Sequence, residues 1–208
     1  IVVLAAVALS AGPAAERRSD LPDRLTDQEF WKLTEDLSEP NGYFRSDNLV
    51  SNEQVFARVV PEVVSRTKPG GVYLGVGPEQ NFTYIAAMKP KMAFIIDIRR
   101  GNLHLHLMYK ALFELSADRA EFLGRLFTRT RPEGLTPQAT AQELFQGYLG
   151  ASPASDEVYR ENLRAIEDVL VKKHKLPLSP EDLSGIDYVY RAFFAYGPSI
   201  TWSTNTGP

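Results

Sequence analysis

The feature that most limits the possible folds is a strand–helix–strand pattern within about 27 residues. Val72–Val76 and Met92–Ile98 are apolar runs typical of buried strands, and Phe82–Met88 between them has a helical pattern. Such a unit is a βαβ crossover, whose two strands lie parallel in one sheet. The chain is therefore predicted to be an α/β protein with a parallel sheet.

Helix signals lie on both sides of this unit. Ser51 and Gln54 form a capping-box pattern, and Asn102 is placed to cap a long helix. The second half is therefore expected to be rich in helix, and the last ten residues to be extended. The predicted helices run from Thr26 to Leu37, from Ser51 to Arg66 with a kink or break at Pro61, from Leu103 to about Phe127, from Thr136 to about Gly147, from Ser155 or Asp156 to Leu170 and from Ser179 to Gly197.

Two strands are few for a parallel sheet, because its strands need neighbours and cover on both faces. We therefore expect the sheet to be truncated in this sequence, with further strands beyond Pro208. The alternative is a small sheet of two or three strands inside a helical shell. Residues 16–208 are expected to form a single domain.

The first residues, IVVLAAVALSAGPAAERRSD, combine a short apolar run with small residues. A run of this length is too short to span a bilayer but resembles the apolar core of a secretory signal. We interpret residues 1–15 as the remnant of a signal peptide, which predicts an exported, periplasmic protein. A buried first strand or helix is the alternative, and it would leave the protein cytoplasmic.

Composition excludes several classes of function. The net charge is -3 and no Lys/Arg-rich block occurs, so no nucleic-acid partner is expected. The chain has no cysteine, which excludes disulfides, thiolate catalysis and cysteine-based zinc sites. No integral membrane span is predicted, no catalytic-triad or P-loop pattern occurs, and the oligomeric state is left open.

The histidines do not predict a metal site. His104 and His106 are two residues apart on a predicted helix, so their side chains point in different directions and cannot share one ion. His174 lies among Lys172, Lys173 and Lys175 and is interpreted as part of a solvated helix end.

A pair of glycines follows the first predicted strand and suggests a binding site for a small molecule. Gly75 and Gly77 allow the backbone to turn sharply and to approach a ligand. In open α/β sheets, ligands bind at the carboxyl ends of the strands. Asp97 ends the second strand, 20 residues after Gly77, where a carboxylate can accept the hydroxyls of a ribose.

These residues also carry a family resemblance. YLGVGPEQNFTYIAA and MAFIIDI resemble the first motif and the acidic strand end of class I methyltransferases that use S-adenosylmethionine. Together with RRGNLHLHLMYKALFELSADRAEFL, they resemble an uncharacterised bacterial family with that Rossmann-like fold, over residues 38–200. The resemblance implies a methyltransferase-like fold, a nucleoside-type pocket and S-adenosylmethionine as the cofactor.

Two positions depart from the methyltransferase pattern. Tyr73 stands where an acidic residue is usual, and Glu79 stands where a third glycine is frequent. A carboxylate at this turn would repel a pyrophosphate, which disfavours NAD and FAD. Glu79 could instead attract the positive charge of S-adenosylmethionine and so replace the missing acid.

Other polar residues near the turn have two interpretations each. Gln80 and Asn81 either bind an adenine or a substrate amide, or cap the helix that they begin. Arg99, or Arg100, either holds an anionic ligand or belongs to a salt-bridged loop. In the loop 42–48, either Arg45, Asp47 or Asn48 lines the site, or the loop packs on its own aromatic side chains, Tyr43 and Phe44.

Two functions compete. One is a methyltransferase-like enzyme that binds S-adenosylmethionine and transfers its methyl group to an unknown acceptor. The other is a non-catalytic, exported binding or sensing protein that retains the fold, which Tyr73 and the signal-like N-terminus favour. A different nucleotide-dependent Rossmann enzyme is a third option, which Glu79 disfavours. In each case the expected partner is a small-molecule ligand.

Overall fold

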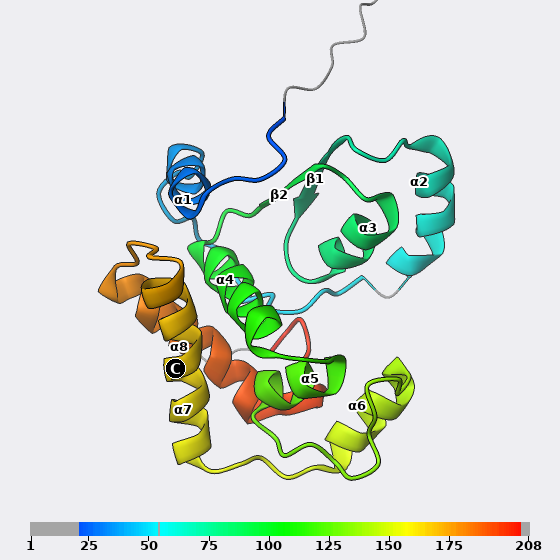
Figure 1. The fold of residues 1–208 in the computed structure, drawn as a ribbon, viewed down its shortest axis with the longest axis vertical. Coiled ribbons are helices and arrows are strands. Elements are labelled where there is room, and N and C mark those ends of the chain that lie inside the picture. Colours follow the sequence, from blue (N-terminus) through cyan, green and yellow to red (C-terminus); the bar gives the residue numbers. More distant parts are fainter. Residues whose placement is uncertain (1–20, 54, 205–208) are drawn as a thin grey trace, which may run out of the picture.

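The computed structural model describes residues 21–53 and 55–204, which form a helix-rich α/β fold with a small parallel sheet (Figure 1). Residues 1–15, predicted to be a signal remnant, and Gln54 lie outside the described residues. The elements are α1 (Asp27–Asp36), η1 (Phe56–Val59), α2 (Val60–Arg66), β1 (Val72–Val76), α3 (Gln80–Met88), β2 (Met92–Ile96), α4 (Arg100–Leu115), α5 (Arg119–Phe127), α6 (Ala141–Gly150), α7 (Asp156–Glu167), the π-helix η2 (Asp168–Lys173), α8 (Pro180–Tyr196) and η3 (Gly197–Ser199).

The predicted βαβ unit is confirmed. β1 and β2 pair in parallel, with Val72 opposite Met92 and Val76 opposite Ile96, and α3 makes the crossover. The sheet of the described residues has these two strands alone, which agrees with the strand number of the alternative, a small sheet inside a helical shell, but one face of the sheet is not covered by helices. The expected further strands concern residues beyond Pro208 and stay a prediction.

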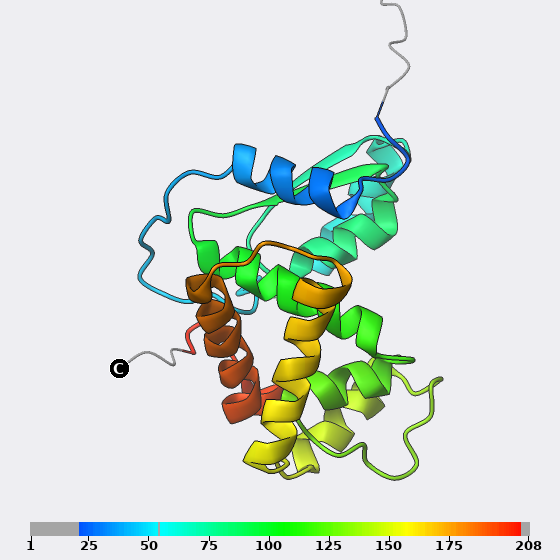
Figure 2. The same cartoon turned by 60° about the vertical axis from the view of Figure 1, so that its left-hand side comes forward.

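The helices α4 to α8 form a body with its own hydrophobic core, below the sheet in Figure 1. α4 lies between the sheet and the other helices and packs on α8, α5 and α7 (Figure 2). Its Leu105, Met108 and Leu112 have no exposed surface, and neither have Leu170 and Ile186 of the neighbouring helices. The helical periodicity of the second half therefore corresponds to a real core.

The sheet differs from this body, because one of its faces is open to solvent. Val72, Leu74 and Val76 alternate along β1, and each has more than half of its surface exposed. Ile96, opposite Val76, is exposed as well. The apolar pattern that identifies these strands is thus covered on one face only.

The prediction of one helix from Leu103 to about Phe127 is wrong. α4 ends at Leu115 and α5 begins at Arg119, because the Asp118 side chain accepts the Glu121 N–H at 2.8 Å and caps a new helix. Aspartate competes with the helical backbone in this way at helix starts. Asn102 is not the cap of α4 either: it lies in the first turn, after Arg99.

Three other predicted boundaries also move. Thr140, not Thr136, caps α6, since Thr140 and Glu143 form a complete capping box. The Ser51 hydroxyl accepts the Glu53 N–H instead of starting a helix, and η1 begins at Phe56. Residues 201–204 form a turn closed by the Thr204 N–H and the Thr201 carbonyl, so this part of the tail is not extended. The predicted starts at Thr26, Ser155 and Ser179 are confirmed.

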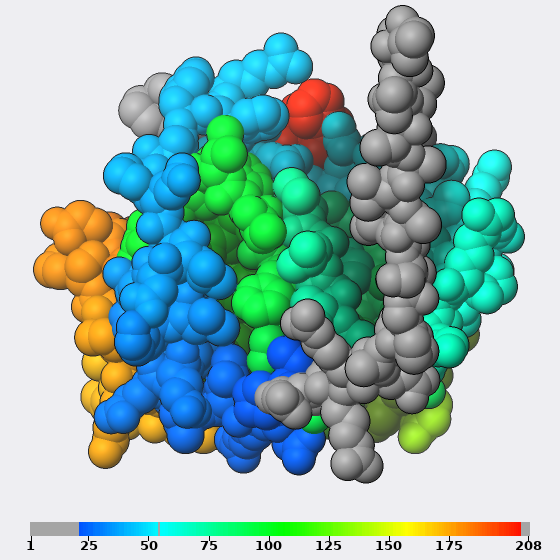
Figure 3. Space-filling model, turned by 90° about the horizontal axis from the view of Figure 1, so that it is seen from above, coloured from blue at the N-terminus to red at the C-terminus, as the bar shows by residue number. Residues whose placement is uncertain are grey.

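The segment between α1 and η1 crosses the carboxyl ends of both strands. The Gly42 N–H donates to the Ile98 carbonyl at 2.7 Å, and the Ser51 N–H donates to the Glu79 carboxylate. Seen from above, this segment and α1 lie beside the region of β2 and α4 (Figure 3). The fold therefore places a loop, residues 41–51, over the edge of the sheet where ligands are expected.

None of the helices in the described part of the chain is both long and apolar enough to span a membrane.

Candidate functional site

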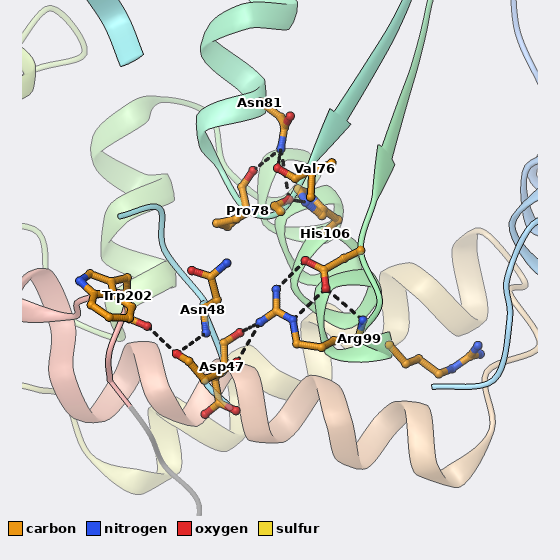
Figure 4. Close-up of polar contacts among 12 residues, drawn as sticks. Asp47, Asn48, Val76, Pro78, Asn81, Arg99, His106 and Trp202 are labelled. Carbon is orange, nitrogen blue, oxygen red and sulfur yellow. Dashed lines mark hydrogen bonds and ion pairs between the residues drawn. The ribbon is translucent and has the colours of Figure 1, made fainter. Parts of the chain in front are cut away.

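The bend between β1 and α3 has the glycine-dependent geometry that its sequence predicts (Figure 4). Gly77 has φ +83°, a conformation that side chains with a Cβ rarely adopt. At Gly75, an added Cβ would lie 1.9 Å from Asn81 Oδ1 and 2.7 Å from Tyr73 Oη. The space beside Gly75 is thus filled by protein side chains.

Asn81 holds this bend together. Its amide Nδ2 donates to the carbonyls of Val76, Gly77 and Pro78 at 3.1, 3.2 and 2.8 Å, and Oδ1 accepts the Tyr73 hydroxyl at 2.7 Å. The side chain is almost fully buried. The predicted capping role of Asn81 is wrong: Glu79 is the N-cap of α3, and no side chain of the described residues caps this helix. Asn81 instead ties the carbonyls of the bend together, and Tyr73 is part of the same network.

His106 supports the bend from α4. Its Nε2 lies 3.1 Å from the Gly77 carbonyl, and its ring packs against Phe82 and Tyr109. Burial lowers the pKa of His106, against opposing effects of the Gly77 carbonyl and Asp97. A neutral imidazole can donate from Nε2 to a carbonyl. Sequence reasoning considered His106 only as a metal ligand and missed this contact.

Glu79 and Gln80 are also engaged within the protein. Both carboxylate oxygens of Glu79 lie 3.0 Å from the Ser51 N–H, and burial raises the pKa of Glu79. Gln80 Nε2 donates to the Val76 carbonyl at 3.0 Å, whereas its Oε1 is buried and has no partner among the described residues. These two side chains thus tie the loop and the helix start to the bend.

Asp97 lies next to this bend, because the Gly77 N–H donates to the carbonyl of the preceding residue, Ile96, at 3.2 Å. Its carboxylate is held by Arg99, whose backbone N–H and Nε lie 3.0 and 2.8 Å from Oδ1 and whose Nη2 lies 2.5 Å from Oδ2. Both side chains are largely buried. The predicted salt-bridged loop is therefore present, and it involves the carboxylate proposed for the ribose.

Arg99 also binds the loop that crosses the sheet edge. Its Nη1 donates to the carbonyls of Ser46 and Asp47, and its Cζ lies 5.6 Å from the centre of the Phe44 ring. The Asp47 carboxylate accepts the Tyr188 hydroxyl of α8 at 2.7 Å. Arg99 thus joins three parts of the chain: the end of β2, the loop and, through Asp47, α8.

Arg99 also lines a cavity of about 350 Å³. The first turns of α4, the loop 41–49 and α8 enclose it. Of the predicted ligand-binding residues, Arg99 lines this cavity; Gly75, Gly77, Glu79, Gln80, Asn81 and Asp97 do not belong to its lining. The structure therefore brings Asp97, Gly75 and Gly77 to the same edge of the sheet. The cavity lies next to that edge, not between Asp97 and the glycines.

The loop 42–48 takes part in this cavity, as one of its two interpretations predicts. Asp47 lines the cavity, while Arg45 does not. Asn48 has φ +48° and its amide points toward the bend, 3.9 Å from where a Cβ on Gly77 would lie (Figure 4). Tyr43 is 88% exposed, so the loop is not packed around its own aromatic side chains.

A second cavity, of about 400 Å³, lies between the start of α1 and the helices α4 and η2. His174 is a wall of this cavity, with Nδ1 2.9 Å from Asp27 and Nε2 2.8 Å from Glu114. His174 lies at a helix end, as predicted, because it is the C-cap of η2. The prediction that this end is solvated is wrong for His174, whose side chain is only 10% exposed. This cavity contains none of the residues predicted to bind a ligand.

Within the described residues, no cluster of three or more histidine, aspartate or glutamate side chains could hold a metal ion. His104 and His106 contact different groups, Asp182 and Gly77 respectively.

Comparison with protein families gives a clear match. The model of a family described as "Domain of unknown function (DUF7790)" matches residues 48–176, well over half of the chain. The chain belongs to the DUF7790 family. The DUF7790 match includes the bend, Asp97 and Arg99, and it ends before α8. No curated protein matches this chain.

Proposed function

We propose that this chain binds a nucleoside-type small molecule at the carboxyl end of its parallel strands, with S-adenosylmethionine as the first candidate. The ligand would occupy the cavity between the loop 41–49, α4 and α8, with its ribose toward Asp97. The observation that carries this proposal is the cavity itself, which adjoins Asp97 through Arg99 at the edge where α/β folds bind ligands.

The hydrogen bonds of Asp97 leave room for a ribose hydroxyl. A carboxylate accepts about four hydrogen bonds. Arg99 supplies two donors to Oδ1 and one to Oδ2. A ligand hydroxyl that reaches past Arg99 can therefore bind Oδ2 without displacing the guanidinium, which would keep the carboxylate oriented.

The walls of the cavity also suit a nucleoside. Its volume falls in the usual range for small-molecule sites, roughly 300–1,000 Å³. Tyr43, Phe44 and Tyr188 contribute aromatic surface, on which a base can stack. Arg99, the cation of the lining, is already paired with Asp97, so no unpaired guanidinium attracts a phosphate. These features favour a nucleoside over a dinucleotide.

Whether the bound ligand is a methyl donor or a signal is the second part of this proposal. Methyl transfer needs an aligned sulfonium and nucleophile more than a dedicated acid or base. However, Asn81 and Tyr73 fill the space beside Gly75, and this observation favours the alternative of a non-catalytic binding or sensing protein.

Calorimetric titration of the full chain with S-adenosylmethionine, S-adenosylhomocysteine and NAD tests the proposal. We expect the first two to bind and NAD to bind at least 10-fold more weakly. Asp97→Asn should weaken binding about 10-fold, the effect of losing one hydrogen bond to a charged group. Glu53→Gln, at an exposed carboxylate, is the matched control. Absence of heat with all three compounds would overturn the proposal.

A radiolabelled methyl group separates the two functions. A methyltransferase should transfer the label from S-adenosylmethionine to an acceptor in an extract, and Asp97→Asn should reduce that transfer. A binding protein should hold both S-adenosyl compounds and release the label unchanged.

A further inference from the structure

The cavity contains a histidine that the sequence does not single out as a ligand-binding residue. His104 lies in the second turn of α4 and lines the cavity beside Gly101. It is 7% exposed, so it reaches the cavity with only a small part of its ring. The partners of its two ring nitrogens determine which hydrogen bond this ring can offer to the cavity.

Asp182 fixes the tautomer of His104. The Asp182 carboxylate is 2% exposed, and its Oδ1 lies 2.9 Å from His104 Nε2. It also accepts Arg100 Nε at 2.6 Å and the Ser179 N–H and hydroxyl at 3.1 Å each. An ionised carboxylate only accepts hydrogen bonds, so Nε2 must carry the hydrogen.

The other ring nitrogen, Nδ1, is then a lone-pair acceptor in a neutral ring. Burial lowers the pKa of His104, while Asp182 acts in the opposite direction. Arg100 already balances the charge of Asp182, so a second cation is not required there. No hydrogen bond to Nδ1 is formed within the part of the chain that the structure describes.

A glycine in the middle of α8 makes room for this ring. A Cβ on Gly185 would lie 2.1 Å from His104 Nδ1 and 2.3 Å from Cε1, so any other residue would displace the imidazole. Glycine in a helix interior is less favourable than alanine. Its presence here is explained by the close approach of the ring, and Gly185 is itself part of the cavity lining.

We propose that His104 Nδ1 is a hydrogen-bond acceptor for the cavity's ligand, which must present a hydroxyl or amino hydrogen at this point. Asp182 and Gly185 act as positioning residues. Asp182 fixes the tautomer of His104, and Gly185 leaves the space in which the imidazole ring lies. The inference rests on the proposed function only in taking the cavity as a ligand site; it does not depend on a nucleoside. An adenosine compound would satisfy it with its amino group or a ribose hydroxyl.

Phenol and anisole provide the test, because they share a ring and differ in one hydrogen-bond donor. In the full chain labelled with ¹⁵N, side-chain histidine spectra should show His104 with hydrogen on Nε2 and a bare Nδ1. Added phenol should shift the Nδ1 resonance and bind at least 5-fold more tightly than anisole. An imidazole with hydrogen on Nδ1, or equal binding of the two compounds, would overturn the inference.

Two variants separate binding from a merely structural role. His104→Phe keeps a ring but removes the acceptor, so the preference for phenol should fall to about 1 while anisole still binds. Gly185→Ala should displace the ring and abolish the same preference, whereas Ser184→Ala, at an exposed neighbour on α8, should leave it unchanged. A preference that persists in both His104→Phe and Gly185→Ala would contradict the inference.

The outcomes also distinguish this inference from the proposed function. If S-adenosyl compounds fail to bind but phenol is preferred through His104, only the nucleoside proposal fails. If they bind with unchanged affinity in His104→Phe, and phenol shows no preference, only the role of His104 fails.

Discussion

The sheet unit, β1–α3–β2, and the helical body, α4–α8, are stabilised in different ways. In the body, apolar side chains such as Leu105, Leu112 and Ile186 have no exposed surface. In the sheet unit, Leu74 and Val76 are 68% and 69% exposed. Burial of apolar surface, the main favourable term in folding, is thus concentrated in the body.

The sheet unit packs on the core through Phe82 of α3, and polar contacts at the carboxyl ends of its strands hold it as well. Asn81 ties the bend, His106 joins it to α4, and Arg99 joins β2 to the loop 41–51. Regions with few buried apolar contacts open at lower free energy than the core. We therefore expect the sheet unit to open locally before the body unfolds, and the proposed cavity lies at the junction of the two.

The largest effect should come from the core of the body. Leu112→Ala removes a fully buried side chain from α4 and should lower the free energy of unfolding by about 2–5 kcal/mol. Urea denaturation followed by circular dichroism measures it. Leu149→Ala, at an exposed position of α6, is the control and should change little. Equal losses in the two variants would mean that the body is not organised around this core.

A smaller and local effect is expected for the bend. Asn81→Ala removes one hydrogen bond from each of three carbonyls and leaves the Tyr73 hydroxyl without its acceptor, so it should weaken the sheet unit by about 1–3 kcal/mol. Hydrogen exchange read by mass spectrometry should show faster exchange in residues 72–96 and unchanged exchange in α8. Uniformly faster exchange would show that the two regions unfold as one unit.

The two regions should also respond to acid in opposite directions. Burial by itself raises the pKa of Glu114, but Lys110, Lys173 and His174 outweigh it and lower the pKa from 4.5 to about 2. Stability from Glu114 is therefore present above pH 4.5 and is lost as the pH falls toward 2. For Glu79, burial raises the pKa, so its contribution decreases as the pH rises through and above 4.5.

Urea midpoints measured between pH 2 and 7 test these signs. In Glu114→Gln, stability should fall less as the pH is lowered below 4.5. In Glu79→Gln, stability should fall less as the pH is raised through and above 4.5. If Glu114→Gln has the same pH profile as the wild type, the ion pairs of Glu114 do not contribute to the pH dependence of stability.

The smallest effect is expected on the open face of the sheet. Leu74→Ala should change the free energy of unfolding by no more than about 0.5 kcal/mol, as for other exposed positions. The measurement is the same urea series. A loss comparable to that of Leu112→Ala would mean that this face is covered in solution and that the contrast between the regions is wrong.

Local signals predicted much of the fold. Capping boxes at Thr26 and Ser179 and the βαβ spacing depend on neighbouring residues, and the structure confirms them. The break at Ser116–Asp118 was missed because the apolar periodicity continues through it, while the cap of Asp118 decides the local structure. Apolar alternation likewise could not reveal that one face of β1 stays exposed.

The candidate site was predictable only in part. The glycine bend and the acidic strand end meet at one edge because parallel strands end together. A sequence pattern does not give the directions of side chains. It could therefore not predict that Arg99 pairs with Asp97 or that Asn81 fills the bend. Gly185 is an isolated glycine within a helical pattern, and it was the one sequence feature that could have indicated the close approach of the His104 ring.

The central claim, a nucleoside-type site at the junction of sheet and body, is tested most directly by mapping S-adenosylmethionine on the full chain with ¹H–¹⁵N spectra. We expect the amide resonances of Asp47, Arg99 and Gly101 to shift, with little change around Lys110 and His174 in the second cavity. Shifts confined to the second cavity, or no shifts at saturating ligand, would contradict the account.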